Sequence, residues 1–597
     1  MPLSPARARG LLLFVALAAY ATALGNRFAY DDNLVVALNP VVTEGDWGEA
    51  ILGPYWPVAR EGSGLYRPLT LASFTAEWPL WKGSPVGFHA VNVVLHAGVS
   101  LLVLSLLLRF TALPGALAGA VLFAIHPVHV EAVANVVGRA ELLAALSVLA
   151  ACVLYLDGDG WGPLGRGARL GGIALLYLTG LGSKEIAVTL PLLLVLVEAY
   201  RSGKPSLARR IAGELPVFVS LGAVLLTYLM LRWSVLGTVT GEVPAPALRG
   251  LTSTERVLTA LSVWPEYVRL MVFPASLSAD YSPGVILVAR SVTPAVLAGA
   301  ATVLAWVVGA VLLARRAPLA SMGLAWFVVA VLPVSNLVVP SGVILAERTL
   351  YLPSVGVSLV LAAAVAAFGG SAERRLRRLA GALAATAGVA LVARTVTRIP
   401  AWLDSFTVVN TLAMERPESY VALQHRAAGL ARVGELAEAA QVYEAALALV
   451  PHHYGLRVEL GALYARLRQE ERATELLRRA IAQDPEQPTA YRLLAEQLVR
   501  LGRAEEGHAI ALEGLARAGS DRELWSLVSE AYIAGGDLEA AVRARQAALG
   551  VDPASAHDWR RLAELYRALG LEEEAREAQT RADATPAGAH PSPWTNP

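Results

Sequence analysis

Long apolar runs recur through the first two thirds of this 597-residue chain and constrain its fold more than any other feature. A helix needs roughly 20 apolar residues to cross a bilayer, and runs near that length recur between Leu11 and Val396. With 55% hydrophobic and 17% charged residues, the chain is too apolar for an ordinary soluble enzyme. We therefore predict an all-α fold whose residues 1–398 form a polytopic membrane bundle of about eleven spans. The predicted spans are residues 11–25, 90–108, 112–126, 140–156, 170–183, 186–200, 211–231, 292–313, 318–334, 350–369 and 378–397.

The C-terminal third repeats with a period of about 34 residues and resembles the tetratricopeptide repeat (TPR). Its turn glycines are Gly434, Gly502, Gly536 and Gly570, with Arg468 as the exception, and its small core residues are Ala427, Gly461, Ala495, Ser529 and Ala563. We predict a linker at 399–419, five repeats at 420–587 and a disordered tail at 588–597. Stacked repeats form a concave surface suited to an extended peptide, so we expect a protein or peptide acceptor there. An array that only caps or dimerises the protein is the alternative.

Lysines and arginines in short loops predict the orientation, because positive loops stay in the cytoplasm. Clusters such as Arg209-Arg210 and Arg315-Arg316 agree with one another only if residues 255–273 lie along the outer interface without crossing. The N-terminus is then cytoplasmic, whereas the first loop, residues 26–88, and the repeats are extracytoplasmic. The run from Leu11 to Ala23 also fits a cleavable signal peptide, which is a competing interpretation.

Polar residues concentrate in the turns that this topology places outside the cytoplasm. Such residues at a membrane edge are costly and mark functional sites. His89, Asn92 and His96 share one helical face. The turns contribute Asp31, Asp32, Arg67, His126, His129, Glu131, Arg139, Glu141, Lys184, Glu185, Glu347 and Arg348.

These motifs, in this order and followed by the repeats, resemble the transmembrane and TPR repeat-containing O-mannosyltransferases, which are GT-C glycosyltransferases. The matching motifs include Tyr30-Asp31-Asp32, Tyr66-Arg67-Pro68-Leu69, and the Glu347-Arg348 pair before Tyr351-Leu352-Pro353. The resemblance implies a bacterial relative in the cytoplasmic membrane. It also implies transfer of a hexose, with mannose expected, from a polyprenyl- or dolichyl-phosphate carrier to an acceptor hydroxyl, such as that of a protein Ser or Thr, on the extracytoplasmic face.

Resemblance and chemistry together give these residues roles. Asp31, with Asp32 as the alternative, is the candidate general base, because adjacent carboxylates raise one another's pKa if they converge. Arg348 is the first candidate for the donor phosphate, since a guanidinium can hold two phosphate oxygens. The remaining substrate-binding candidates are Arg67, Arg139, Lys184, Glu347, Glu185, His126, His129, Glu131, His89 and Asn92.

No cofactor is expected. A divalent-metal site formed by His126, His129 and Glu131 is the alternative, because imidazole and carboxylate suit such ions. The arginines and Lys184 have an alternative of their own, which is to pair with Glu141, Glu185 or Glu347.

Two other functions compete with the glycosyltransferase. In one, the repeats recruit envelope proteins and the bundle is only an anchor. In the other, the bundle is a transporter or flippase, which requires charged groups near mid-membrane. The net charge of +1 gives no indication of a nucleic-acid partner.

Overall fold

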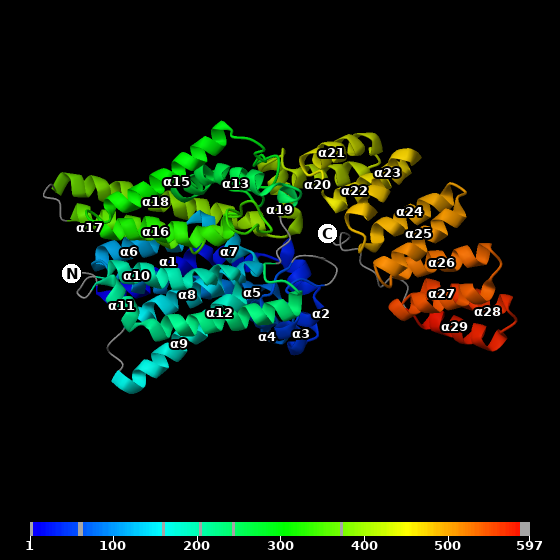
Figure 1. Ribbon diagram of the computed structural model, residues 1–597, viewed down its shortest axis with the longest axis horizontal. Coiled ribbons are helices and arrows are strands. Elements are labelled where there is room, and N and C mark those ends of the chain that lie inside the picture. The colour runs from blue at the N-terminus through cyan, green and yellow to red at the C-terminus, as the bar shows by residue number, and fades with distance from the viewer. Residues whose placement is uncertain are drawn as a thin grey trace. The chain divides into compact units, whose positions relative to one another are not determined.

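The computed structural model describes residues 4–57, 64–157, 162–201, 206–240, 245–369 and 374–585, and these ranges are helical without any strand. The predicted tail at 588–597 lies outside them. Contacts divide the chain between Ser419 and Tyr420 into two compact units (Figure 1). The all-α fold that the sequence predicts is therefore confirmed.

Each predicted span coincides with a helix of the first unit. These helices are α1 (Pro5–Tyr20), α5 (Pro85–Leu107), α6 (Leu113–Ile125), α8 (Arg139–Leu156), α9 (Gly162–Ser183), α10 (Leu190–Tyr200), α12 (Leu215–Leu236), α15 (Pro294–Leu313), α16 (Pro318–Val331), α17 (Ser354–Gly369) and α18 (Arg374–Arg398). Among the described residues, six helical stretches are long and apolar enough to cross a membrane alone, and a bent pair, 113–125 with 127–134, makes a seventh. The number of spans stays a prediction, because several of the other helices are short.

Between the membrane helices lie shorter elements, and several of the polar candidate residues lie in them or next to their ends. In the first loop and the turns that follow it they are η1 (Ala21–Gly25), η2 (Asn33–Ala37), α2 (Pro40–Thr43), α3 (Trp47–Leu52), α4 (Pro68–Trp81), η3 (Pro127–His129), α7 (Val130–Ala134), η4 (Val136–Gly138), η6 (Glu185–Thr189) and α11 (Leu207–Gly213). Later in the unit they are η7 (Pro246–Leu248), α13 (Ser253–Ser262), α14 (Trp264–Val272), η8 (Leu332–Val334), η9 (Glu347–Leu350), η10 (Ile399–Trp402) and α19 (Ser405–Glu415).

The first loop folds on a small core of its own. Asn39 and Asp46 start α2 and α3 by accepting hydrogen bonds from the backbone N–H groups of Val41 and Glu49, at 3.1 and 2.9 Å. Buried side chains from the loop, together with one from α5, then pack together: Val35, Val36, Val42, Leu71, Phe74 and Phe88. The loop is therefore a structured layer that can hold a polar side chain in one place.

Residues 255–273 fall in α13 and α14, two helices of 10 and 9 residues. At 1.5 Å per residue each is about 15 Å long, half the thickness of the hydrocarbon core. Trp264 and Tyr267 of α14 are buried in a cluster that includes Phe327 of α16. This geometry agrees with the prediction that the stretch does not cross.

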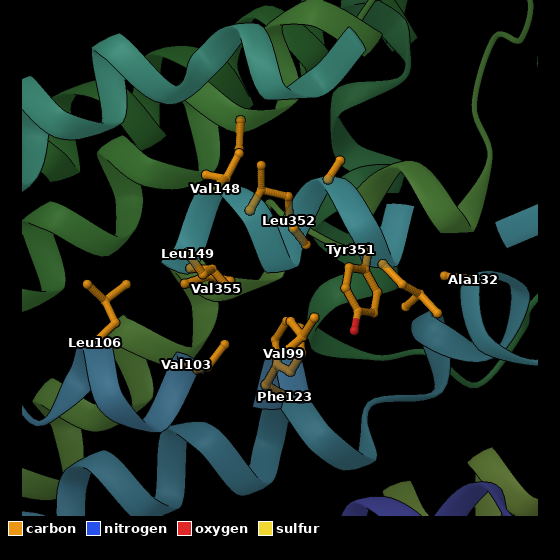
Figure 2. Close-up of a cluster of buried hydrophobic side chains, with 14 of the residues drawn as sticks. Val99, Val103, Leu106, Phe123, Ala132, Val148, Leu149, Tyr351, Leu352 and Val355 are labelled. Carbon is orange, nitrogen blue, oxygen red and sulfur yellow. The ribbon is translucent and has the colours of Figure 1, made fainter. Parts of the chain in front are cut away.

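Close packing in the bundle fixes the turn that precedes α17. A Cβ added to Gly323 of α16 or to Gly356 of α17 would come within 2.4 Å of the other residue's carbonyl oxygen. Small residues permit this approach, as in other membrane helix pairs. Figure 2 shows the adjoining apolar core, where Tyr351 lies among side chains from α5, α6, α8 and α17. The hydroxyl of Tyr351 lies 2.7 Å from His96 Nδ1. Residues 347–351 are thus anchored to the bundle.

Residues 399–419, predicted as a linker, are part of the first unit. They form η10 and α19, and Trp402 and Val408 are buried in the main core of the bundle. The backbone N–H of Arg27 donates to the carbonyl of Leu403 at 2.7 Å. Its buried apolar side chains and its backbone hydrogen bond explain why this stretch packs against the bundle. It is therefore more than a connection between the two units.

Residues 420–585 of the second unit form five stacked helix pairs, yellow to red in Figure 1. They are α20 (Tyr420–Arg432) and α21 (Leu436–Leu449), α22 (Tyr454–Arg466) and α23 (Glu470–Gln483), α24 (Pro488–Arg500) and α25 (Ala504–Arg517), α26 (Arg522–Ala534) and α27 (Leu538–Val551), and α28 (Ala556–Ala568) and α29 (Glu572–Ala584). The turn inside each pair needs a left-handed residue. Gly434 has φ +92°, and Arg468 is forced into the same region at +59°. The exception in the sequence is therefore a strained turn within the same architecture.

Candidate active site

The two adjacent aspartates of the first loop have different environments. Asp32 is fully buried and accepts three backbone N–H groups, from Ala29 and Val136 at Oδ2 and from Val137 at Oδ1, at 3.1, 3.2 and 2.8 Å. Burial raises the pKa of Asp32 to about 7, although these hydrogen bonds by themselves lower it. Asp32 therefore ties the first loop to the turn at 135–138. Asp31 stays partly exposed, which makes it the better placed of the two to act as a base.

Arg348 and Glu131, which are far apart in the sequence, form the centre of the site. The guanidinium of Arg348 pairs with the carboxylate of Glu131, which also accepts the backbone N–H of Arg348 at 2.8 Å. The side chain of Glu131 is 1% exposed and that of Arg348 is 25% exposed. Arg348, the candidate for binding the donor phosphate, is thus held by a buried carboxylate and is still partly exposed.

Asp31 lies within electrostatic range of this guanidinium. Burial lowers the pKa of Arg348, but the negative charges of Glu131, Asp31 and Glu141 outweigh it and raise the pKa above its ordinary value. The charge of the candidate base therefore acts on the residue that is the candidate for binding the donor phosphate.

Lys184 joins the same group of charges. Its ammonium pairs with Glu141, and both side chains are buried. Burial lowers the pKa of Lys184, Glu141 opposes this, and the positive charges of Arg67 and Arg348 lower it further. Lys184 is therefore within range of both arginines, and the alternative pairing with Glu141 is also observed.

Arg67 pairs with Glu185, the second alternative that the sequence left open. Arg67 Nη2 donates to Glu185 Oε2 at 2.8 Å, and Nε donates to the same oxygen at 3.1 Å. Arg232 of α12 lies 3.3 Å from the other oxygen of Glu185 and donates to the carbonyl of Gly64 at 2.6 Å. Sequence reasoning missed Arg232, although a lone arginine at the end of an apolar helix was a signal.

Arg139 does not belong to this group. It is fully buried, and its donors reach Asn92 Oδ1 at 2.9 Å, Glu77 Oε1 at 2.5 Å and the Phe88 carbonyl at 3.0 Å. Its guanidinium also lies 4.7 Å above the ring of Phe74. The proposed phosphate-binding role of Arg139 is therefore not supported, and its acidic partner is Glu77 instead of Glu141.

Asn92 and His89 support the backbone around the site. The amide of Asn92 donates to the carbonyls of Asn135 and Val136 at 3.1 and 3.2 Å, and so shapes the turn that binds Asp32. His89 Nε2 lies 3.3 Å from the carbonyl of Arg27. Both side chains are buried, so the structure gives them a structural role instead of direct substrate contact.

The buried histidines of the 126–129 turn also contact protein groups. His126 Nε2 lies 3.1 Å from the Met271 carbonyl, and His129 Nε2 lies 2.9 Å from the hydroxyl of Ser354. Glu131 is committed to Arg348. Across the described ranges, no three His, Cys, Asp or Glu side chains converge as metal ligands would. The structure gives no support to the alternative metal site.

Glu347 points away from Arg348. Its Oε1 accepts the backbone N–H of Ser278 at 2.5 Å and the hydroxyl of Tyr281 at 2.8 Å, and burial raises its pKa to about 7. The same loop brings Asp280 close enough for the charges of Glu131 and Arg348 to act on it, and burial raises its pKa too. Asp280 had no recognisable motif, and only the fold places it beside the site.

The arrangement can support transfer of a group from an anionic leaving group. Arg348, Lys184 and Arg67 supply positive charge near one another, each held by a carboxylate. Asp31 adds a partly exposed carboxylate, whose charge acts on Arg348. Preorganised cations of this kind stabilise charge that develops on a departing phosphate, and a nearby carboxylate can accept a proton.

Fold and site together define an integral membrane protein with a polar site built from the turns of a helical bundle, followed by a TPR solenoid. A family model described as "Tetratricopeptide repeat" matches residues 468–531.

Curated relatives of the chain include proteins named as O-mannosyl-transferases. The chain is 27% identical over 374 residues to protein O-mannosyl-transferase F38B6.6 of Caenorhabditis elegans, covering 59% of this chain and 51% of the relative. It is 30% identical over 409 residues to human protein O-mannosyl-transferase TMTC4, covering 58% and 54%. The predicted resemblance to the TPR-containing O-mannosyltransferases is confirmed. The chain spans about half the length of these relatives.

Similar solved structures include a crystal structure of MamA, 17% identical with a TM-score of 0.25, covering 27% of this chain and 93% of MamA. Another is YrrB, titled a TPR protein with an unusual peptide-binding site, 19% identical with a TM-score of 0.24, covering 30% and 93%.

Proposed function

We propose that this protein is a membrane glycosyltransferase that moves a hexose, with mannose as the first choice, from a polyprenyl-phosphate carrier to an acceptor hydroxyl. The observation that carries the proposal is Asp31 within electrostatic range of Arg348, which the buried Glu131 holds in place. The similarity to named protein O-mannosyl-transferases supports the choice of sugar and of reaction.

In the proposed reaction, the acceptor oxygen attacks the anomeric carbon of the lipid-linked sugar. Asp31 takes the proton of the acceptor hydroxyl. The bond between the anomeric carbon and the phosphate oxygen breaks, and the phosphate leaves with the bonding electrons. Arg348 and Lys184 stabilise the added negative charge. A single displacement of this kind inverts the configuration of the anomeric carbon.

The acceptor in this proposal is a protein Ser or Thr hydroxyl on the extracytoplasmic face. Positive charge in the opposite loops, such as Arg209-Arg210, supports that orientation. The TPR solenoid supports a polypeptide acceptor, since stacked helix pairs form a surface suited to an extended chain.

A donor panel tests the proposal. The full-length protein in lipid nanodiscs would be given mannose, glucose or galactose on a polyprenyl monophosphate, and mannose on a nucleotide, with Ser/Thr peptides as acceptors. We expect transfer from the polyprenyl-phosphate mannose and none from the nucleotide sugar.

Substitution of two arginines distinguishes a glycosyltransferase from a membrane-anchored scaffold. Arg348→Gln should lower the transfer rate by about 10²-fold or more, because a neutral amide cannot stabilise the leaving phosphate. Arg315→Gln, in an exposed loop of the same unit, is the matched control. Wild-type rates in Arg348→Gln would contradict the assigned site, and failure of the wild type with every donor would favour the scaffold hypothesis.

A further inference from the structure

The segment between the last membrane helix and the solenoid reaches back to the loop that carries Asp31. The carbonyl of Leu403 accepts the backbone N–H of Arg27 at 2.7 Å. Two residues later, the hydroxyl oxygen of Ser405 accepts the backbone N–H of Tyr30 at 2.8 Å and the side-chain amide of Asn33 at 2.9 Å. More than 370 residues of chain separate these partners. The contacts bracket Asp31 on both sides.

The backbone next to Asp31 is strained. Tyr30 has φ +54°, in the left-handed region that residues with a Cβ rarely adopt. Such a conformation persists only where surrounding contacts hold it, and strained residues concentrate at functional sites. Ser405 provides one such contact, because its hydroxyl oxygen accepts the backbone N–H of Tyr30 itself. The hydroxyl therefore acts on the backbone that sets the direction of the Asp31 side chain.

The segment that carries Ser405 is itself fixed. Asp404 begins α19 by accepting the backbone N–H of Thr407 at 2.8 Å. At the far end of α19, Glu415 pairs with Arg398 of α18 at 2.6 Å. Trp402 is buried in the core of the bundle. Ser405 thus projects from a rigid support, as a residue that positions another must.

We propose that Ser405 is a positioning residue for the transfer reaction: its hydroxyl holds the Tyr30 backbone and the Asn33 side chain so that the Asp31 carboxylate faces the acceptor. This inference rests on the proposed function, because it assigns Asp31 the role of base. It gives residues 399–419 a part in catalysis as well as in connecting the two units.

Three variants of the full-length protein test this. Ser405→Ala removes the acceptor of both hydrogen bonds, Ser405→Thr keeps a hydroxyl, and Asn410→Ala changes an exposed position of the same helix. We expect Ser405→Ala to lower kcat by about tenfold with the KM for the donor changed less than twofold, since a misplaced base slows the chemical step. Ser405→Thr should recover most of the rate, and Asn410→Ala should match the wild type.

Hydrogen exchange and a double variant supply independent readouts. Amides in peptides covering residues 26–38 should exchange faster in Ser405→Ala than in Asn410→Ala or the wild type. Ser405→Ala should slow an Asp31→Asn variant no further, because both changes act on one group. A wild-type kcat and unchanged exchange in Ser405→Ala would overturn the inference, as would an equal rise in KM and fall in kcat with no recovery in Ser405→Thr. Absence of transfer by the wild type would instead refute the proposed function.

Discussion

The membrane unit and the solenoid use ion pairs in different ways. In the membrane unit, Glu131 and Glu141 are 1% exposed, and each holds a cation of the site. In the solenoid, the pairs Glu475–Arg479 and Glu577–Arg581 are more than half exposed and lie one helical turn apart. Exposed pairs of this kind contribute little to stability, whereas breaking a buried pair leaves an uncompensated charge. The buried ion pairs of the first unit therefore hold side chains of the site in one arrangement. Most charges of the second unit instead interact with water at its surface.

Substituting the two kinds of glutamate should give the largest contrast. Glu131→Gln removes the charge that fixes Arg348, so we expect transfer to fall by about 10²-fold. Glu475→Gln, in the solenoid, should change neither transfer nor folding measurably. Transfer rates from a polyprenyl-phosphate sugar check both. Equal rates in the two variants would remove the distinction between the units.

The pH dependence of stability should differ in sign between the units. Burial raises the pKa of Glu347 to about 7, so its folded state binds a proton more tightly than the unfolded state. Its contribution, up to about 3 kcal/mol, is complete below about pH 4.5 and is lost as the pH rises through 7. The free energy of unfolding of the wild type, minus that of Glu347→Gln, should decline as the pH rises from 4 to 8. Thermal unfolding of both proteins measures it. A difference that is constant with pH would contradict it.

Asp558 is the exception within the solenoid and should behave in the opposite way. Burial alone would raise its pKa, but hydrogen bonds with Ser555, Arg522 and Arg545 lower it to about 2. Its stabilisation is present above its ordinary pKa and is lost as the pH falls through 2. At neutral pH, Asp558→Ala should destabilise the last repeats by about 2 to 3 kcal/mol, since Arg545 is 1% exposed. Hydrogen exchange of α28 in the full chain, with Glu577→Ala as the control, measures this.

Much of the fold could be predicted from the sequence because it follows from local patterns. Apolar runs gave the membrane helices, and the period gave the solenoid, including the turn at Arg468. The number of spans could not be settled, since α10 and α16 are too short by themselves. The role of residues 399–419 was missed because their partners, Arg27 and Tyr30, are distant in sequence.

The sequence supplies a set of candidate site residues, but not their geometry. The sequence ranks Asp31 before Asp32 as the candidate base, but only the fold shows that the Asp32 carboxylate accepts backbone N–H groups. Arg139 precedes Glu141 by two residues, yet on a helix such neighbours do not face each other, and its partner is Glu77. Asp280 and Ser405 carry no motif, so their places depend on tertiary contacts.

Arg468 should give the smallest effect and a gain of stability. Its φ of +59° is costly for a residue with a Cβ, whereas the equivalent turns have glycine. Arg468→Gly should stabilise the solenoid by about 0.5 to 1 kcal/mol, through relief of strain offset by the greater freedom of glycine in the unfolded chain. Denaturant unfolding followed by hydrogen exchange of α22 and α23 checks this, and a loss of stability would show that Arg468 makes contacts that outweigh its strain.

Comparing Asp31→Asn with Asp32→Asn tests whether one aspartate is the base and its neighbour is a structural support. Sugar transfer from polyprenyl-phosphate mannose and the thermal unfolding temperature would be measured for both variants. We expect Asp31→Asn to lose transfer by about 10³-fold while unfolding like the wild type, and Asp32→Asn to unfold at a lower temperature. Substantial transfer by Asp31→Asn would contradict the role of Asp31 as the base. Loss of transfer in Asp32→Asn alone, with that variant stably folded, would instead make Asp32 the base.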